Sequence, residues 1–364
     1  MTIPAEIQTK LERVRALMDA RQVDTLWLRT VDNVAWITGG VDTAVNTAST
    51  LGVASVVITQ HDCTVWTNTI EAPRLGLEDQ IEARGFKIFA TPWEQSAGIP
   101  PGQSLGVDYP LSGAMDLGGD LTRLRVRLLP VEQERFRQLG ISCAEAMHRA
   151  INRVHPGNTE NEIAAALEYE TRIRNVTPIV VLIATDERIH RYRHPLPTTK
   201  ILDKYAMLVL CGRRDGLVIS VTRLVHFGPL PDDLRRRMEA TAEVDAAMIA
   251  ASQPGTSLEE VFRVAQETYA RVGFEGEWKL HHQGGLAGYT PRDVLAVPGE
   301  TTLLEPGMVC AWNPSITGAK SEDSVMVPAA PGQTPEILTP MFGWPVQRVE
   351  INGIALDRPL IMEL

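Results

Sequence analysis

The sequence predicts a two-domain protein of the α/β (α+β) class, with an N-terminal α/β domain over 1–125, a linker over 126–134 and a second domain over 135–364. Three observations lead to this prediction. The length of 364 residues suits two domains. Helical and strand-like stretches alternate before residue 125, and an internal duplication follows residue 134.

The first domain opens with apolar residues at helical spacing, which predict an amphipathic helix near the N-terminus. Four short apolar stretches then predict strands, because they are bounded by polar and turn-forming residues. They are 24–30 (DTLWLRT), 54–60 (ASVVITQ), 63–68 (CTVWTN) and 104–108 (SLGVD). The polar stretch 118–134 is expected to carry the domain boundary.

The second domain repeats one pattern. An alanine-rich helix leads into HPGNTENEI (155–163), and another leads into QPGTSLEEV (253–261). Each has a Pro-Gly helix stop, then a Thr or Ser cap with Glu three residues later, which begins a new helix. Strand candidates follow each copy, over 178–184, 205–212 and 217–223, and over 277–285, 307–314 and 322–328. We therefore expect two pseudo-twofold-related helix-helix-strand units, with four helices on one face of a curved sheet and a cleft on the other.

Composition limits the partners. The formal net charge is −10 and the pI about 5.4, so the chain should repel nucleic acids and anionic membranes on average. We expect neither as a partner. The N-terminus lacks the uninterrupted apolar stretch of a signal peptide, which predicts a cytoplasmic protein.

Four stretches of the second domain carry a family resemblance, in the same order along the chain: GLVISVTRLV (216–225), HHQGGLAGYTPRD (281–293), PGMVCAWNPS (306–315) and SEDSVMV (321–327). They resemble motifs of the creatinase, prolidase and Xaa-Pro aminopeptidase family, as does DTLWLRTVDNVAWITGG (24–40) in the first domain. The resemblance implies a creatinase-like N-terminal domain, a pita-bread domain like that of methionine aminopeptidase, and a homodimer.

Metalloenzymes of that family hold two divalent ions with two Asp, one His and two Glu. By the resemblance these ligands fall on Val209, Ser220, Gly285, Asn313 and Glu322, so only Glu322 is retained. Hard divalent ions need several oxygen ligands. We therefore expect no dinuclear metal centre and no cofactor, although a single zinc on one histidine, Glu322 and Cys211 stays open.

The family's catalytic histidine falls in ERIHRYRHPLPTTK (187–200), where His190 and His194 are equal candidates. Histidine suits proton transfer at neutral pH, and Glu322 could orient a water. His281 and His282 are further candidates. Because adjacent strand residues point to opposite faces, we expect only one of these two to face the cleft.

Arginines are frequent in the segments expected to border the cleft, which favours an anionic group on the ligand. The alternative is that they pair with Asp215, Asp293 and Asp323 in structural ion networks. The residues expected to bind substrate are Arg223, Arg292, Tyr289, Asn313 and Ser220.

Three functions stay open. The first is a metal-independent hydrolase of a small amide, amidine or peptide-like substrate with an anionic group, as creatinase hydrolyses a guanidino compound without metal. The second is a catalytically inactive pseudoenzyme that binds a small molecule or short peptide. The third is a Xaa-Pro aminopeptidase or dipeptidase with an altered metal site.

Overall fold

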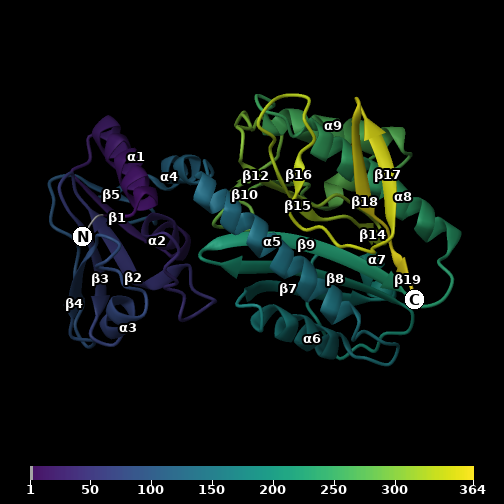
Figure 1. Ribbon diagram of the computed structural model, residues 1–364, viewed down its shortest axis with the longest axis horizontal. Coiled ribbons are helices and arrows are strands. Elements are labelled where there is room, and N and C mark those ends of the chain that lie inside the picture. The colour runs from purple at the N-terminus through teal and green to yellow at the C-terminus, as the bar shows by residue number, and fades with distance from the viewer. Residues whose placement is uncertain (1–2) are drawn as a thin grey trace. The chain divides into compact units, whose positions relative to one another are not determined.

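The computed structural model describes residues 3–364 and divides into two compact units (Figure 1). One unit ends at Val131 and also includes Asp215–Leu217. The other consists of Glu132–Arg214 and Val218–Leu364. The stretch expected to be a linker, 126–134, includes the start of helix α5 at Pro130.

The first unit is built on a six-stranded sheet of order β4-β3-β2-β1-β5-β6. Its strands are β1 (Thr25–Thr30), β2 (Leu51–Ile58), β3 (Cys63–Asn68), β4 (Lys87–Thr91), β5 (Leu105–Val107) and β6 (Met115–Asp116). Its helices are α1 (Ala5–Arg21), α2 (Val31–Thr38), α3 (Ala72–Leu77) and α4 (Gly118–Arg125). The predicted amphipathic helix is α1, whose apolar stripe is buried.

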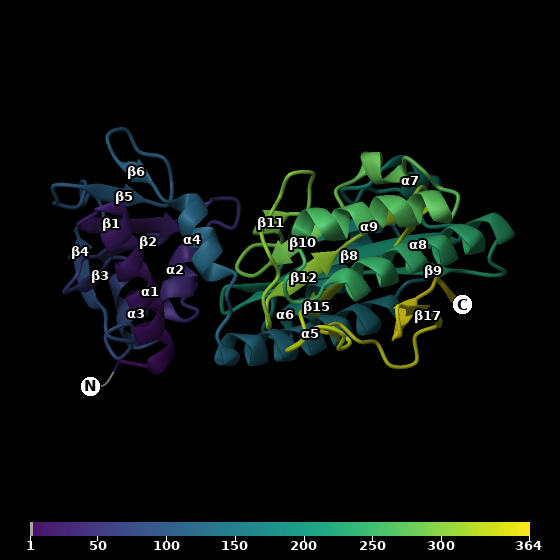
Figure 2. The ribbon, with the colours of Figure 1, turned by 90° about the horizontal axis from the view of Figure 1, so that it is seen from above.

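The second unit contains the predicted duplicated helices. Its helices are α5 (Pro130–Ile151), α6 (Glu160–Arg172), α7 (Glu187–Arg191), α8 (Asp232–Ala251), α9 (Leu258–Arg271) and the 3-10 helix η1 (Glu277–Leu280). Thr159 and Glu162 form a complete capping box at α6, and Ser257 caps α9 by accepting from the Glu260 backbone N–H. The two copies thus start their second helices in the same way. Figure 2 shows α8 and α9 side by side.

Two sheets of this unit meet at Glu322. One sheet, of order β19-β9-β8-β7, and another, of order β11-β10-β12-β15-β16, are joined by a bridge between Thr222 and Glu322. The first contains β7 (Thr177–Thr185), β8 (Tyr205–Arg214), β9 (Leu217–His226) and β19 (Met362–Glu363). The second contains β10 (Gly284–Ala287), β11 (Val294–Leu295), β12 (Val309–Trp312), β15 (Asp323–Met326) and β16 (Glu336–Ile337).

Two short hairpins complete the unit: β13 (Ser315–Ile316) with β14 (Ala319–Lys320), and β17 (Val346–Ile351) with β18 (Ile354–Pro359). The strand predicted over 277–285 is wrong in its first half, where η1 ends at Leu280 and β10 begins only at Gly284. Within residues 3–364, no helix combines the length and apolar character needed to cross a membrane.

A buried ion network lies next to the bridge between the sheets. Arg358 on β18 pairs with Asp245 on α8, with 2.7 Å between Nη2 and Oδ2, and also pairs with Asp323 on β15. Arg223 on β9 donates to the other oxygen of Asp323 at 2.9 Å. All four side chains are at most 3% exposed. The network therefore fixes β15, and with it the neighbouring Glu322, relative to β9 and α8.

Replacing Arg358 with Met should lower the free energy of unfolding by about 3–5 kcal/mol. Asp245 would lose its arginine partner, and Asp323 would lose one of its two arginine partners, while both carboxylates stay buried. The matched control is Arg348→Met on the same hairpin, where the pair with Asp357 is largely exposed and the change should stay within about 0.5 kcal/mol. Urea unfolding of both variants measures this. Equal losses would show that the network does not stabilise the unit.

Candidate functional site

A pocket of about 310 Å³ lies within the second unit, beside the bridge between its sheets. One part of its wall is apolar, and the other carries histidines and charged side chains. The lining residues are Val180, Leu182, Val209, Cys211 and Pro291, and His194, His282, Arg292, Asn313, Lys320 and Glu322.

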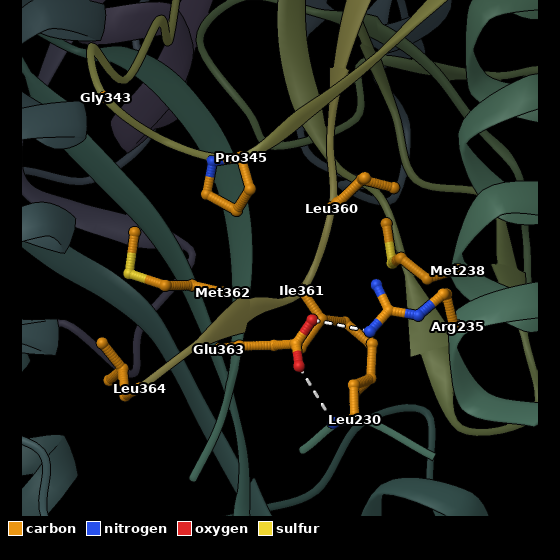
Figure 3. Close-up of a pocket in the computed structure, with 10 residues that line it drawn as sticks. All are labelled: Leu230, Arg235, Met238, Gly343, Pro345, Leu360, Ile361, Met362, Glu363 and Leu364. Atoms are coloured by element: carbon orange, nitrogen blue, oxygen red, sulfur yellow. Dashed lines mark hydrogen bonds and ion pairs between the residues drawn. The ribbon is translucent and has the colours of Figure 1, made fainter. Parts of the chain in front are cut away.

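A larger pocket, of about 430 Å³, is the weaker candidate (Figure 3). Its two charged side chains, Arg235 and Glu363, pair with each other at 2.7 Å, and Glu363 also accepts from the Leu230 backbone N–H (Figure 3). The rest of its lining is mostly apolar. The smaller pocket therefore holds the groups that can do chemistry.

Glu322 lines the smaller pocket and pairs with two cations. Its Oε1 accepts from Arg292 Nη2 at 2.9 Å, and its Oε2 accepts from Lys320 Nζ at 2.8 Å and from the Thr222 hydroxyl at 2.5 Å. Burial alone would raise the pKa of Glu322, but the charges of Lys320 and Arg292 outweigh it and hold this pKa well below its usual range. Such a carboxylate is a weak base, so its expected role in assisting catalysis gives way to a role in holding the two cations.

The two cations reach Glu322 from different elements. Arg292 follows β10 along the chain, and its Nη1 also donates to the Ser220 hydroxyl on β9 at 3.0 Å. Lys320 is the last residue of β14, two positions before Glu322, and is 4% exposed. Together the three groups carry one net positive charge into the pocket. An anionic ligand group is therefore favoured there.

The residues present do not fit the two-metal centre that the family resemblance implies. Val209 offers no ligand atom, and the space beside Gly285 is filled by the neighbouring strand, since a Cβ there would lie 2.0 Å from the Val294 carbonyl oxygen. The one retained carboxylate, Glu322, already binds Lys320 and Arg292. Two divalent ions placed beside those cations would have too few oxygen ligands and would be repelled.

Three histidines gather at one side of the pocket. Nε2 of His194 lies 3.1 Å from Nε2 of His281, and the rings of His281 and His282 have centroids 4.5 Å apart. The expectation that only one of His281 and His282 faces the cleft agrees with the pocket lining, which includes His282 and not His281. The reason differs from the expected strand alternation, because both residues lie between η1 and β10. His194 and His282 line the pocket, and His281 is buried behind them.

All three imidazoles are neutral at physiological pH. Burial is the main cause: it lowers the pKa of His281 to about 2 and that of His282 to about 4, with nearby cations adding to the effect. Burial and then the charge of Lys320 also lower the pKa of His194. A neutral imidazole can accept a proton, so His194 is available as a base, whereas the low pKa of His282 makes that ring a weak one.

The structure separates the other predicted residues from the pocket lining. His190 packs against Gly318, and the Tyr289 hydroxyl donates to Glu132 on α5 at 2.5 Å. Arg223 belongs to the buried network with Asp323, as the structural alternative anticipated. These positions do not suit the catalytic role expected of His190 or the binding roles expected of Tyr289 and Arg223. Their side chains are committed to packing or to partners inside the fold.

Two other predicted residues do bear on the pocket. Asn313 lines it directly, and its buried Oδ1 has no partner among the described residues. Ser220 is fully buried, and its hydroxyl accepts a hydrogen bond from Arg292, so it positions that guanidinium. Lys320 was not predicted. Its spacing of two residues from Glu322 is the signal that could have found it, because residues two apart along an extended chain share a face.

Cys211 also lines the pocket, but burial raises the pKa of its thiol. The Cys211 Sγ lies 3.3 Å from the Ser220 hydroxyl. A neutral thiol is a poor nucleophile. The chemistry of the site therefore rests on the histidines and the two cations.

Comparisons with known proteins agree with this architecture. The model of metallopeptidase family M24 matches residues 134–329. A Xaa-Pro dipeptidase of Lactobacillus helveticus is 25% identical over 222 residues, which are 58% of this chain and 60% of that protein. The agropine synthesis cyclase of Rhizobium rhizogenes is 29% identical over 213 residues, 50% of this chain and 53% of the cyclase. The chain thus spans little more than half the length of these two relatives.

The fold also matches solved structures over nearly the whole chain. The prolidase of Pyrococcus horikoshii OT3 superposes with a TM-score of 0.77 and 18% identity, covering 92% of this chain and 98% of the prolidase. At that identity the likeness shows the fold alone. It agrees with the predicted pita-bread architecture and its additional N-terminal domain.

The buried histidines should make stability depend on pH. As the pH falls from about 6.5 to about 4, the unfolded chain binds a proton at residue 282 that the folded chain does not, so stability falls. Replacing His282 with Asn should reduce the stability lost between pH 7 and 5 by about 2 kcal/mol. Urea unfolding at the two pH values measures this, with the exposed His155→Asn as control. An unchanged loss in His282→Asn would contradict the buried neutral state.

Proposed function

This chain belongs to metallopeptidase family M24, and from that premise we propose that it hydrolyses a small amide, amidine or peptide-like substrate without the two-metal centre. The observation that carries the proposal is the pair of cations on Glu322, at 2.8 and 2.9 Å. Arg292 and Lys320 occupy the two Glu322 oxygens that a pair of metal ions would need as ligands. In metal-dependent hydrolysis a bound ion lowers the pKa of water, so here another group must activate it.

The neutral His194 is the acid–base group best placed to do so. It lies at the exposed mouth of the pocket, and its Nε2 is held 3.1 Å from His281. In the proposed step, His194 accepts a proton from water as the water oxygen attacks the carbonyl or amidine carbon. The C–N bond then breaks, and the imidazolium returns the proton to the leaving nitrogen. Water is consumed and no metal takes part.

The charge of the pocket supports a substrate with a carboxylate. Arg292 and Lys320 together outweigh Glu322 by one positive charge, and the Nε of Arg292 is buried without a partner among the described residues. A guanidinium with a free N–H suits a carboxylate oxygen. A pocket of about 310 Å³ suits a dipeptide or a short guanidino acid.

The cyclase relative gives independent support for chemistry other than peptide hydrolysis at this type of site. Its name describes a cyclase, and its identity to this chain, 29%, is above the 25% of the Xaa-Pro dipeptidase. Function depends on the site residues rather than on the fold. Membership of family M24 therefore does not require a metal-dependent peptidase here.

Carboxylate recognition predicts a difference between two matched ligands. The dipeptide Ala-Pro should bind roughly tenfold or more tightly than its C-terminal amide, because only the acid can pair with Arg292 and Lys320. Calorimetry measures both affinities. Arg292→Met should abolish the difference, whereas the control Arg271→Met, whose partner Glu243 lies outside the pocket, should preserve it. Equal affinities in the unmodified protein would overturn the anion-binding proposal.

Turnover distinguishes the three functions that stay open. Hydrolysis of Ala-Pro or guanidinoacetate should be insensitive to metal chelators and should fall roughly 100-fold in His194→Gln, because the proton acceptor is lost. Product release can be followed by chromatography. Activity that is lost with chelator and restored by Mn²⁺ would instead indicate a metallopeptidase. Ligand binding without turnover would indicate the inactive, ligand-binding alternative.

A further inference from the structure

We propose that His194, His281 and His282 bind one divalent transition-metal ion such as zinc, without Glu322 as a ligand. Each ring offers one nitrogen, and the three nitrogens lie within 4.8 Å of one another. The inference goes beyond the proposed hydrolysis, because it assigns a metal to residues that the family resemblance does not align with metal ligands.

The spacing of two of the donors already suits a metal. With Zn–N bonds of about 2.0–2.1 Å in a tetrahedral site, two nitrogen ligands lie about 3.3 Å apart. The two Nε2 atoms of His194 and His281 are 3.1 Å apart. The third nitrogen, from His282, needs a shift of roughly 1–1.5 Å to complete the set, which rotation of a half-buried side chain can supply.

The imidazole of His282 also has a ring nitrogen without a hydrogen-bond partner among the described residues. This nitrogen, Nδ1, is buried, so it is free to join the two Nε2 atoms of His194 and His281. A buried polar atom without a partner is costly, and such atoms commonly bind water or an ion.

The donor set selects the kind of metal. Three imidazoles favour zinc, copper or nickel, whereas Mg²⁺ and Mn²⁺ prefer oxygen ligands. Three protein ligands leave a fourth position, and His194 and His282 place that position at the pocket. The charges of Lys320 and Arg292 reach this cluster and oppose a cation, so we expect weaker binding than at a three-histidine site without nearby cations.

Calorimetric titration of the full-length, metal-free protein with zinc sulfate tests the proposal. We expect one ion per chain, with affinity reduced more than about tenfold in His282→Asn and in His281→Asn. The control is His155→Asn, an exposed histidine outside the cluster, which should bind zinc like the unmodified protein. Circular dichroism checks folding, and His282→Asn decides if the buried His281 variant does not fold.

The proposal is overturned if zinc does not bind at millimolar concentration, if two ions bind, or if His282→Asn binds as tightly as the unmodified protein. X-ray absorption at the zinc edge should show three histidine nitrogens in the first shell, and a carboxylate-dominated shell would also overturn it. Because zinc alone is the probe, failure here leaves the binding and turnover of Ala-Pro to be judged separately. Zinc should inhibit the proposed hydrolysis, since it would occupy the lone pair of His194.

Discussion

The pairing of Glu322 with Arg292 and Lys320 is the interaction on which the rest of the site depends. Glu322 lies where two sheets of the second unit are bridged, and its carboxylate accepts from one cation at 2.9 Å and from the other at 2.8 Å. A buried carboxylate needs compensating charge, and in the metallopeptidases of this family two divalent ions supply it. In this structure the side chains of Arg292 and Lys320 pair with the carboxylate, and neither group activates water as a metal ion does.

This exchange of ions for side chains changes the chemistry that the pocket can support. A bound ion would generate a nucleophilic hydroxide at neutral pH. Two cations on a carboxylate instead make a fixed positive surface, beside which buried histidines stay neutral. On the proposed function, the pocket binds an anionic group and has one proton acceptor, His194, at its side. The same neutral imidazoles are free to bind a soft or borderline metal, so metal binding and the family's two-metal chemistry become separate questions.

The sequence was sufficient for the fold, because ordered motifs and capping residues are local. Thr159 and Ser257 cap their helices as the repeated pattern predicts. The pocket itself depends on tertiary contacts. Arg223 pairs with Asp323 inside the fold, whereas Arg292 reaches the pocket, although both were equal candidates by composition. His281 and His282 meet the same neighbour because the strand begins after them, a boundary that alternation of residues could not reveal.

The most direct measurement is a crystal structure of the protein grown in excess Mn²⁺, with anomalous diffraction recorded at the manganese edge. We predict that Arg292 and Lys320 remain within hydrogen-bonding distance of Glu322 and that no anomalous peak lies beside this carboxylate. Two manganese peaks next to Glu322, with the two cations displaced, would contradict it and would make the chain a metallopeptidase with an unrecognised ligand set.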